Sequence, residues 1–283
     1  MKYNYWIWDV TAIVATYDRY YALLNLIQSF SESEYSDLNF IVVDSSPLPS
    51  DINYKNVKHI HVPSDTWISK QRNIALENVR TPLFLLLDDD YLCVSGTNIN
   101  KMLNYINSWE VDIIWWNLIN ILSEQYSFDG SYDFIDNTLY HRVEVKNNNW
   151  LYDVIFNFFI AKTDQIKWIW WRDDELKYAR EHDDFFLNAK RNWLKVWYDK
   201  EIIVEHYSYS KHHWWTLWIS SVEHFKRKWN IENKVEVRYI ERENEKYISY
   251  FNAIKWGSEI SLKIKEKIKS IYGDYPIKIQ NAN

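Results

Sequence analysis

Short apolar runs alternate with helical patterns along the first 90 residues. Four runs rich in aliphatic and β-branched residues are typical of buried strands, at residues 11–17, 39–44, 57–62 and 83–87. The intervening residues 19–30 and 69–79 carry apolar side chains at helical spacing. Strands that alternate with helices predict a mainly parallel sheet with right-handed crossovers. The pattern therefore indicates an α/β protein in which helices flank the sheet.

The second half of the chain has a more mixed pattern. Helical spacing recurs over residues 98–108, 184–192 and 214–228. Strand-like segments are found in the same region, at residues 111–114 and 154–161, with hairpins over 122–146 and a strand pair over 194–206. We interpret residues 1–230 as one domain.

Residues 231–283 are rich in Lys and Glu and predict a helical C-terminal extension. Residues 259–271 place Ile260, Ile264 and Ile268 on one face of a helix with several lysines. This helix could cover the sheet, or it could rest on an anionic membrane surface as a peripheral contact. Packing against the sheet is the preferred interpretation.

Composition narrows the range of partners and compartments. The net charge is −6 and the first 230 residues hold no dense basic stripe, which argues against a nucleic-acid partner. Residues 1–10 lack the pattern of a signal peptide, and the longest apolar runs are too short to span a bilayer. The single cysteine, Cys93, cannot form an intrachain disulfide. We expect a cytoplasmic protein that at most contacts the inner face of a membrane.

Glycine and tryptophan have unusual frequencies. The chain has 4 Gly and 17 Trp, whereas ordinary usage predicts about 20 Gly in a chain of this length. Several Trp stand where turns favour Gly, at residues 67, 170–171, 193 and 214–215. One hypothesis is that a codon reassigned to Gly has been translated as Trp; the alternative is a Trp-rich surface that binds sugars. We therefore assign no function to any single Trp.

Acidic residues follow two of the predicted strands. Asp44 ends the second strand, and Asp88, Asp89 and Asp90 end the fourth. The carboxyl ends of parallel strands meet at one edge of a sheet, which is where ligands bind in such folds. Crowded carboxylates repel one another unless a cation neutralises them, and Mg²⁺ or Mn²⁺ would do so while sharing substrate phosphates. The alternative is a solvated acidic turn.

Five stretches, in their order and spacing, resemble the nucleotide-diphospho-sugar glycosyltransferases of the GT-A fold, in particular family 2. They are residues 15–19 (ATYDR), 42–46 (VVDSS), 68–73 (ISKQRN), 88–90 (DDD) and 180–187 (REHDDFFL). The resemblance covers roughly residues 11 to 230. It implies a Rossmann-like mixed sheet, a nucleotide-sugar donor that is UDP-linked, and a divalent metal. The motif EHDDFF at residues 181–186 also resembles the β-1,4-N-acetylgalactosaminyltransferase branch.

The resemblance assigns roles at the donor end of the site. It implies that the donor contacts Thr16, Tyr17, Arg19, Asp44, Lys70, Arg72, Asp88 and Asp89. It implies that Asp90 ligates the metal and that His206, after a β-rich run, is a further ligand. The alternative for His206 is a structural histidine.

The acidic helix start near residue 181 is where an inverting member of this family keeps its base. A base must take the proton from the acceptor hydroxyl during attack. Here His182 occupies the position of the usual Asp, so His182 and the adjacent Asp183 are both candidates. Acidic residues nearby could face the acceptor, namely Asp173, Asp174, Glu181 and Asp184. Alternatively, the acids complement the helix dipole and His182 serves packing.

The resemblance implies a hexosyl- or N-acetylhexosaminyl-transferase that acts on a saccharide or lipid-linked acceptor, as in polysaccharide biosynthesis. Two other functions remain open. A sugar-1-phosphate nucleotidyltransferase would need a Gly-rich phosphate loop after the first strand, and residues 15–19 hold no Gly. A non-catalytic nucleotide- or sugar-binding protein would not need the acids at 88–90 and 181–184.

Overall fold

The computed structural model describes ten segments of the chain: residues 4–48, 51–108, 111–121, 129–143, 150–169, 172–207, 215–242, 245–252, 262–272 and 277–279. The four strands expected in the first half are present as β1 (Val10–Thr16), β2 (Asn39–Asp44), β3 (Val57–His61) and β4 (Leu83–Asp88). They lie side by side in the order β3-β2-β1-β4, and all three pairings are parallel. The parallel core predicted by the alternating pattern is confirmed.

Later strands extend this sheet and make it mixed. The order continues from β4 through β10 (Phe159–Lys162), β6 (Ile113–Asn120), β11 (Val196–His206) and β5 (Tyr91–Leu92). β10 is antiparallel to both of its neighbours, whereas β11 and β6 are parallel. A short strand, β9 (Trp150–Tyr152), pairs with β11. The sheet counts nine strands within the described residues.

Helices flank the sheet as expected. α1 (Tyr20–Ser31) and α2 (Ile68–Asn78) connect the first strands, and α2 packs against β1 and β2. α3 (Ile99–Ser108) lies on β6, and α4 (Thr163–Trp168) contacts α2 and β10. An N-terminal 3₁₀ turn, η1 (Ile7–Asp9), precedes β1. The α/β class with a mixed sheet between helices is confirmed.

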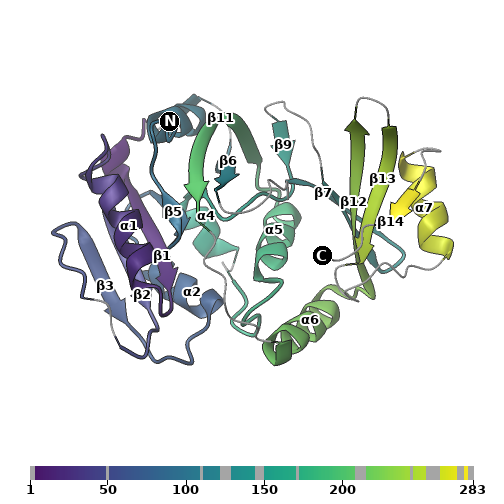
Figure 1. Cartoon of the computed structure of the whole chain (residues 1–283), viewed down its shortest axis with the longest axis horizontal. Helices are drawn as coiled ribbons and strands as arrows, with labels where there is room; N and C mark the ends of the chain where they lie inside the picture. The colour runs from purple at the N-terminus through teal and green to yellow at the C-terminus, as the bar shows by residue number, and fades with distance from the viewer. Residues whose placement is uncertain are drawn as a thin grey trace.

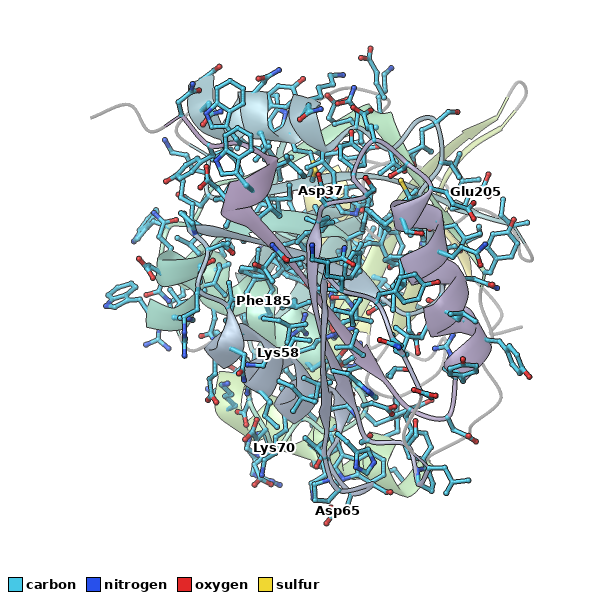
Figure 2. The ribbon with its side chains drawn as sticks, turned by 90° about the vertical axis from the view of Figure 1, so that its left-hand side faces the viewer. Asp37, Lys58, Asp65, Lys70, Phe185 and Glu205 are labelled. Carbon is cyan, nitrogen blue, oxygen red and sulfur yellow. The ribbon has the colours of Figure 1, made fainter. Side chains whose placement is uncertain are left out.

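The apolar runs form the centre of the core. All five residues from Leu83 to Leu87 in β4 are buried, because β4 is covered on both faces and lies between β1 and β10. Phe159 on β10 stacks on Phe185 with ring centroids 5.6 Å apart. Phe185 belongs to α5 (Glu181–Arg191) and lies inside the molecule (Figure 2). The core therefore fixes α5 against the middle of the sheet.

A second sheet joins the middle of the chain to its C-terminal part. Its order is β14 (Ile277–Ile279), β13 (Glu245–Asn252), β12 (Asn233–Arg242), β8 (Thr138–Val143) and β7 (Gly130–Ile135). In Figure 1, α5 lies between the two sheets and α6 (Trp215–Trp229) runs below them. One expected helix is present after residue 231, α7 (Leu262–Tyr272). The extension also contains a hairpin and a third strand that the helical interpretation did not foresee.

Two further expectations differ from the structure. Residues 194–206 were expected as a strand pair, but a single strand, β11 (Val196–His206), occupies this stretch, and its register shifts between Asp199 and Ile203. α5 begins at Glu181, three residues before the expected start, so the acidic cluster is its first turn. Parts of the expected 122–146 hairpins, and Trp170, Trp171 and Trp214, lie outside the described residues. Within the described segments, no helix is both long and apolar enough to cross a bilayer.

Candidate active site

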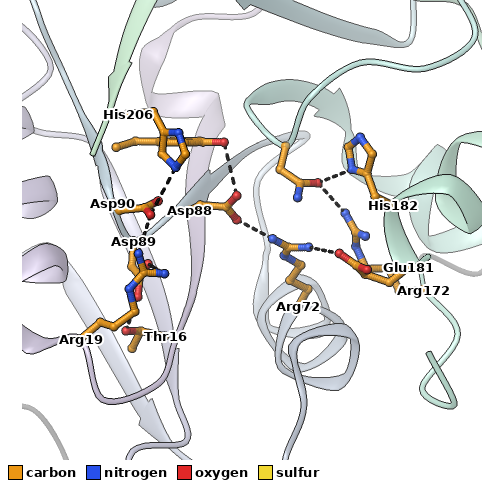
Figure 3. Close-up of polar contacts among 12 residues, drawn as sticks. Thr16, Arg19, Arg72, Asp88, Asp89, Asp90, Arg172, Glu181, His182 and His206 are labelled. Carbon is orange, nitrogen blue, oxygen red and sulfur yellow. Dashed lines mark hydrogen bonds and ion pairs between the residues drawn. The ribbon is translucent and has the colours of Figure 1, made fainter. Parts of the chain in front are cut away.

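A cavity opens at the edge of the first sheet where β1 and β4 end. Its volume is about 380 Å³, within the range of small-molecule sites, roughly 300–1,000 Å³. Six of the residues expected to bind the donor line it, namely Thr16, Tyr17, Arg19, Arg72, Asp88 and Asp89. Asp90, His206 and Glu181 line the same cavity (Figure 3). The parallel register explains this, because Ala15 of β1 lies opposite Asp88 of β4.

Asp89 and Asp90 are held by groups from β1 and the loop that follows it. Thr16 Oγ1 donates a hydrogen bond to Asp89 Oδ2 at 2.6 Å, and Arg19 Nη1 lies 3.1 Å from Asp89 Oδ1. Arg19 Nη2 also pairs with Asp90. Burial nevertheless raises the pKa of Asp89 to about 7, against the opposing charge of Arg19 and with a contribution from Asp90. Arg19 therefore does not fully compensate the buried negative charge.

His206 ends β11 next to Asp90. The distance from His206 Nε2 to Asp90 Oδ2 is 3.3 Å, and His206 Nδ1 lies 2.6 Å from Asn120 Oδ1. Burial alone would raise the pKa of Asp90, but the hydrogen bond from His206 and the charge of Arg19 outweigh it and lower that pKa. An Nδ1–H donated to Asn120 would leave Nε2, the atom that faces Asp90, available as a ligand.

The donor set fits a hard divalent cation. Asp90 offers carboxylate oxygen and His206 offers imidazole nitrogen, and their facing atoms are 3.3 Å apart. Among the described residues, no group of three or more His, Cys, Asp or Glu side chains is arranged to hold a metal. Mg²⁺ and its relatives are often bound by one or two protein ligands, with waters and substrate phosphates completing the shell. The residues present therefore fit a metal that arrives with a diphosphate.

Arg72 links the acidic strand end to α5. Its Nη2 pairs with Asp88, and its Nη1 lies 3.5 Å from Glu181 Oε1. The guanidinium is buried in the cavity wall while both carboxylates keep some exposure. Tyr91 donates a further hydrogen bond to Asp88 at 3.3 Å. One arginine thus sets the spacing between the donor end and the first turn of α5.

Two residues expected to contact the donor do not line this cavity. Asp44 is fully buried below it, where Ser46 N donates to its carboxylate at 2.8 Å and His59 Nε2 lies 3.2 Å away. Its neighbour Ser45 lines the cavity in its place. Lys70 is exposed on the opposite face of α2 (Figure 2), because residues 70 and 72 point about 200° apart on a helix.

The first turn of α5 sends four consecutive side chains in four directions, since successive residues turn by about 100°. Glu181 points into the cavity. His182 points into the protein, where its Nδ1 lies 2.7 Å from Asn157 Oδ1 and its Nε2 contacts the Ile155 carbonyl. Burial, with the charge of Arg172 adding to it, lowers the pKa of His182 to about 3.

The next two residues of the turn anchor α5 to other elements. Asp183 binds Lys234 Nζ at 2.8 Å and accepts a hydrogen bond from Tyr132 at 2.5 Å. Asp184 binds Lys228 Nζ at 2.9 Å and Trp229 Nε1 at 2.7 Å, both from α6. Like His182, Asp183 and Asp184 do not line the cavity, so neither of the two expected base candidates, His182 and Asp183, faces it.

The remaining acceptor-side candidates also lie elsewhere. Asp173 pairs with Lys228 at 2.9 Å and with His224 at 3.0 Å, and Asp174 accepts a hydrogen bond from Asn73 at 2.7 Å. Both line a separate cavity of about 620 Å³ on the far face of α2, together with Lys70.

Sequence reasoning missed several residues of the cavity wall. Asn157, Lys177 and Tyr178 line it, and so does Gln71, whose Nε2 lies 3.3 Å from the Thr16 carbonyl oxygen. A signal existed for Asn157, because it is the one polar residue between Val154 and Ala161. Lys177 and Tyr178 carried no comparable signal, since they lie in a loop whose position depends on its contacts with α2 and α6.

Curated relatives share the β-1,4-N-acetylgalactosaminyltransferase name that one motif suggested. The chain is 25% identical over 210 residues to β-1,4 N-acetylgalactosaminyltransferase 1 of Rattus norvegicus, covering 70% of this chain and 38% of that protein. It is 27% identical over 188 residues to β-1,4 N-acetylgalactosaminyltransferase 2 of Mus musculus, covering 64% and 36%. The chain thus spans less than two fifths of the length of these relatives.

Solved structures confirm the GT-A fold. S. aureus TarS 1–349 aligns with a TM-score of 0.54 and 15% identity over 78% of this chain and 72% of that one. GalNAc-T7 with UDP, GalNAc and Mn²⁺ aligns with a TM-score of 0.56 and 11% identity over 70% and 44%. At these identities the likeness concerns the fold. The sequence profile of Glycosyl transferase family 2 matches residues 11–167, more than half of the chain. The chain therefore belongs to glycosyl transferase family 2.

Proposed function

We propose that this chain transfers a sugar from a UDP-linked donor to a saccharide or lipid-linked acceptor, with a divalent metal and with inversion at the anomeric carbon. The observation that carries the proposal is the single cavity in which Asp88, Arg72 and Glu181 form one chain of charged contacts. It joins the acidic strand end, where a nucleotide would bind, to a carboxylate that could act as a base. Known relatives named N-acetylgalactosaminyltransferases favour an N-acetylhexosamine as the sugar.

The nucleotide would occupy the wall formed by β1, the loop after it and the start of α2. Thr16, Tyr17 and Ser45 lie on this wall with the buried Arg72. Polar groups of this kind orient the nucleobase and the ribose of a nucleotide in a largely pre-formed cleft. Two of the structural neighbours were solved with UDP or UDP-GlcNAc, which supports a uridine nucleotide.

Asp90 and His206 would hold the metal, and Asp89, at the same strand end, would place a further negative charge near it. The metal, when bound, would supply positive charge to the leaving diphosphate. Arg19 pairs with both carboxylates and lines the cavity, so its guanidinium is positioned to turn from Asp90 to a diphosphate oxygen. Manganese is the favoured ion, since the neighbouring structure of GalNAc-T7 contains Mn²⁺.

Glu181 is the proposed base, in place of His182 and Asp183. Its carboxylate lines the cavity, is oriented by Arg72 Nη1 at 3.5 Å, and comes from the first turn of a helix. It would accept the proton of the acceptor hydroxyl as the oxygen attacks the anomeric carbon. Tyr178, whose side chain is 40% exposed, would support the acceptor ring from the loop before α5.

The deciding experiment measures UDP release from UDP-N-acetylhexosamines with Mn²⁺ and a panel of saccharide acceptors. Glu181→Gln should lower kcat by about 10²–10⁴ while the affinity for UDP stays the same, because the amide cannot take the proton. Glu77→Gln, an exposed residue on the outer face of α2, is the matched control. NMR of the product anomer tests inversion. Normal turnover of Glu181→Gln, or retention of configuration, would contradict the proposal.

A further inference from the structure

A buried ion pair links the second sheet to the start of α5. Lys234 on β12 has 0% exposure, and its Nζ lies 2.8 Å and 3.0 Å from the two oxygens of Asp183. Tyr132 on β7 donates to Asp183 at 2.5 Å, and Arg180 Nη1 lies 3.1 Å away. Glu236, on the same strand as Lys234, lies 3.4 Å from its Nζ. Two cations and two carboxylates therefore share one interior site.

Stability alone is a poor reason for such a pair. Removing both charges from water is costly, and buried ion pairs are often no more stabilising than apolar side chains of similar size. The pair instead fixes the orientation of the Asp183 side chain, because both of its carboxylate oxygens contact Lys234 Nζ. Burial would raise the pKa of Asp183, but Lys234 and Arg180 hold it well below its usual range, so the carboxylate stays charged.

The pair acts on the residue that faces the cavity. Asp183 is two positions after Glu181 in the same helical turn, so a rotation or shift of this turn moves both side chains. The turn also begins after a constrained residue, since Arg180 adopts φ 67°. A left-handed arginine persists where its surroundings hold it, and here its guanidinium contacts Asp183 as well.

We propose that Lys234 is a positioning residue, which through Asp183 fixes the first turn of α5 and so holds Glu181 in the cavity. The C-terminal part of the chain thereby contributes to catalysis without touching the substrate. This inference rests on the proposed role of Glu181 as the base.

The test compares Lys234→Met, Asp183→Asn and the double variant with wild type. Lys234→Met should lower kcat by about 10- to 100-fold, the loss expected from a misplacement of about 1 Å, while KM for the UDP-sugar changes less than about twofold. Hydrogen exchange of the peptide over residues 181–187 should become faster in the absence of any substrate. The double variant should be no worse than Lys234→Met, because the two residues act as one unit.

Lys101→Met is the matched control. Lys101 pairs at 2.7 Å with Asp199, which like Asp183 is buried, but neither lines the cavity. Its kcat and the exchange of residues 181–187 should match wild type. If Lys234→Met does not fold, the double variant, which removes one cation and one carboxylate and so leaves the net charge of the site unchanged, gives the same two readouts.

The outcomes separate this inference from the proposed function. If wild type transfers no sugar, the proposed function fails, and hydrogen exchange alone then decides whether Lys234 orders α5. If folded variants without Lys234 keep wild-type exchange and kcat, the positioning role is wrong. It is also wrong if kcat effects of the two single variants add in the double variant, or if Lys101→Met shows the same changes.

Discussion

Trp193 lies just after the C-terminus of α5, at a position where helices usually have glycine. It follows α5 with φ 61° and is 89% exposed. Its N–H bonds to the Lys190 carbonyl and the N–H of Leu194 bonds to the Ala189 carbonyl, both at 3.0 Å. This pair of bonds defines a Schellman motif, whose left-handed residue is usually Gly. The structure therefore adds support to the glycine hypothesis at position 193.

Other tryptophans do not share this geometry. Trp67 has φ −78°, which any residue adopts, so positive φ gives no reason for Gly there. Trp115 is 1% exposed and stacks on Tyr198 with ring centroids 4.6 Å apart. The hypothesis therefore has to be judged one position at a time.

We expect Trp193→Gly to stabilise the protein by about 1–2 kcal/mol, because Gly removes the penalty of a left-handed conformation. The same change at Trp115 should destabilise it by about 3–5 kcal/mol, because a packed ring is lost. Thermal unfolding measures both, at roughly 2–4 °C per kcal/mol for a chain of this size. A lower melting temperature for Trp193→Gly would argue for a genuine tryptophan.

Asp90→Ala should abolish transfer and the stabilisation that UDP and Mn²⁺ give together, because a metal ligand is lost. The fold should persist, since one of three crowded carboxylates is removed. Asp37→Ala, an exposed acid in another loop, is the control (Figure 2). Thermal shift with and without Mn²⁺ is the measurement, and saturating ligand is worth about 2.7 kcal/mol at 100 times its Kd. If Asp90→Ala keeps more than about a tenth of the wild-type activity, a change in activation free energy below 1.4 kcal/mol, Asp90 is not a metal ligand.

At the scale of the element, α5 is the part whose placement decides the site. Through successive residues, its first turn lines the cavity and contacts the segment before β10, the second sheet and α6. Acidic side chains also suit a helix N-terminus, where they complement the dipole. These contacts fix the position of the turn, and a catalytic base must be fixed in this way.

The pH dependence of stability should report the state of His182. Its pKa is lowered from 6.5 to about 3 in the folded protein, so below pH 6.5 the unfolded chain binds a proton that the folded chain does not. The stability associated with the neutral ring is therefore present above pH 6.5 and is lost as pH falls toward 3. We expect His182→Gln to unfold with a smaller pH dependence over this window.

Chemical denaturation at several pH values measures this slope. Asn104→Gln, which changes an exposed side chain on α3 that does not titrate, should keep the wild-type slope. Equal slopes for wild type and His182→Gln would mean that the ring titrates normally in the folded protein.

At the scale of the whole molecule, the two sheets are interleaved along the chain. β7 and β8 of the second sheet lie between β6 and β10 of the first in sequence, and β12 pairs with β8 across about 95 residues. Lys234 of β12 also neutralises Asp183 inside the protein. A boundary at residue 230 therefore divides a sheet rather than two independent units.

A chain that ends at residue 230 should lack a cooperative unfolding transition, because β8 loses its pairing with β12 and Asp183 loses the charge of Lys234. A chain that ends at residue 252 keeps β12, β13 and Lys234, and should retain the transition. Calorimetry of the two truncated chains makes the comparison. A cooperative transition in the shorter chain, near the wild-type temperature, would support the boundary predicted from composition.

Local pattern alone determined the four strands of the first half, the helices between them and the edge of the sheet where the acids gather. These follow from apolar spacing and from the rule that the carboxyl ends of parallel strands meet. The family resemblance, not the strand pattern, implied that Asp90 and His206 lie together, and their facing atoms are 3.3 Å apart. Tertiary structure decided which of residues 181–184 faces the cavity, because 100° of helical rotation separates neighbours and only packing selects the face. It likewise turned Lys70 away and brought Lys234 beneath α5, since a pairing between distant strands leaves no mark on either strand's own pattern.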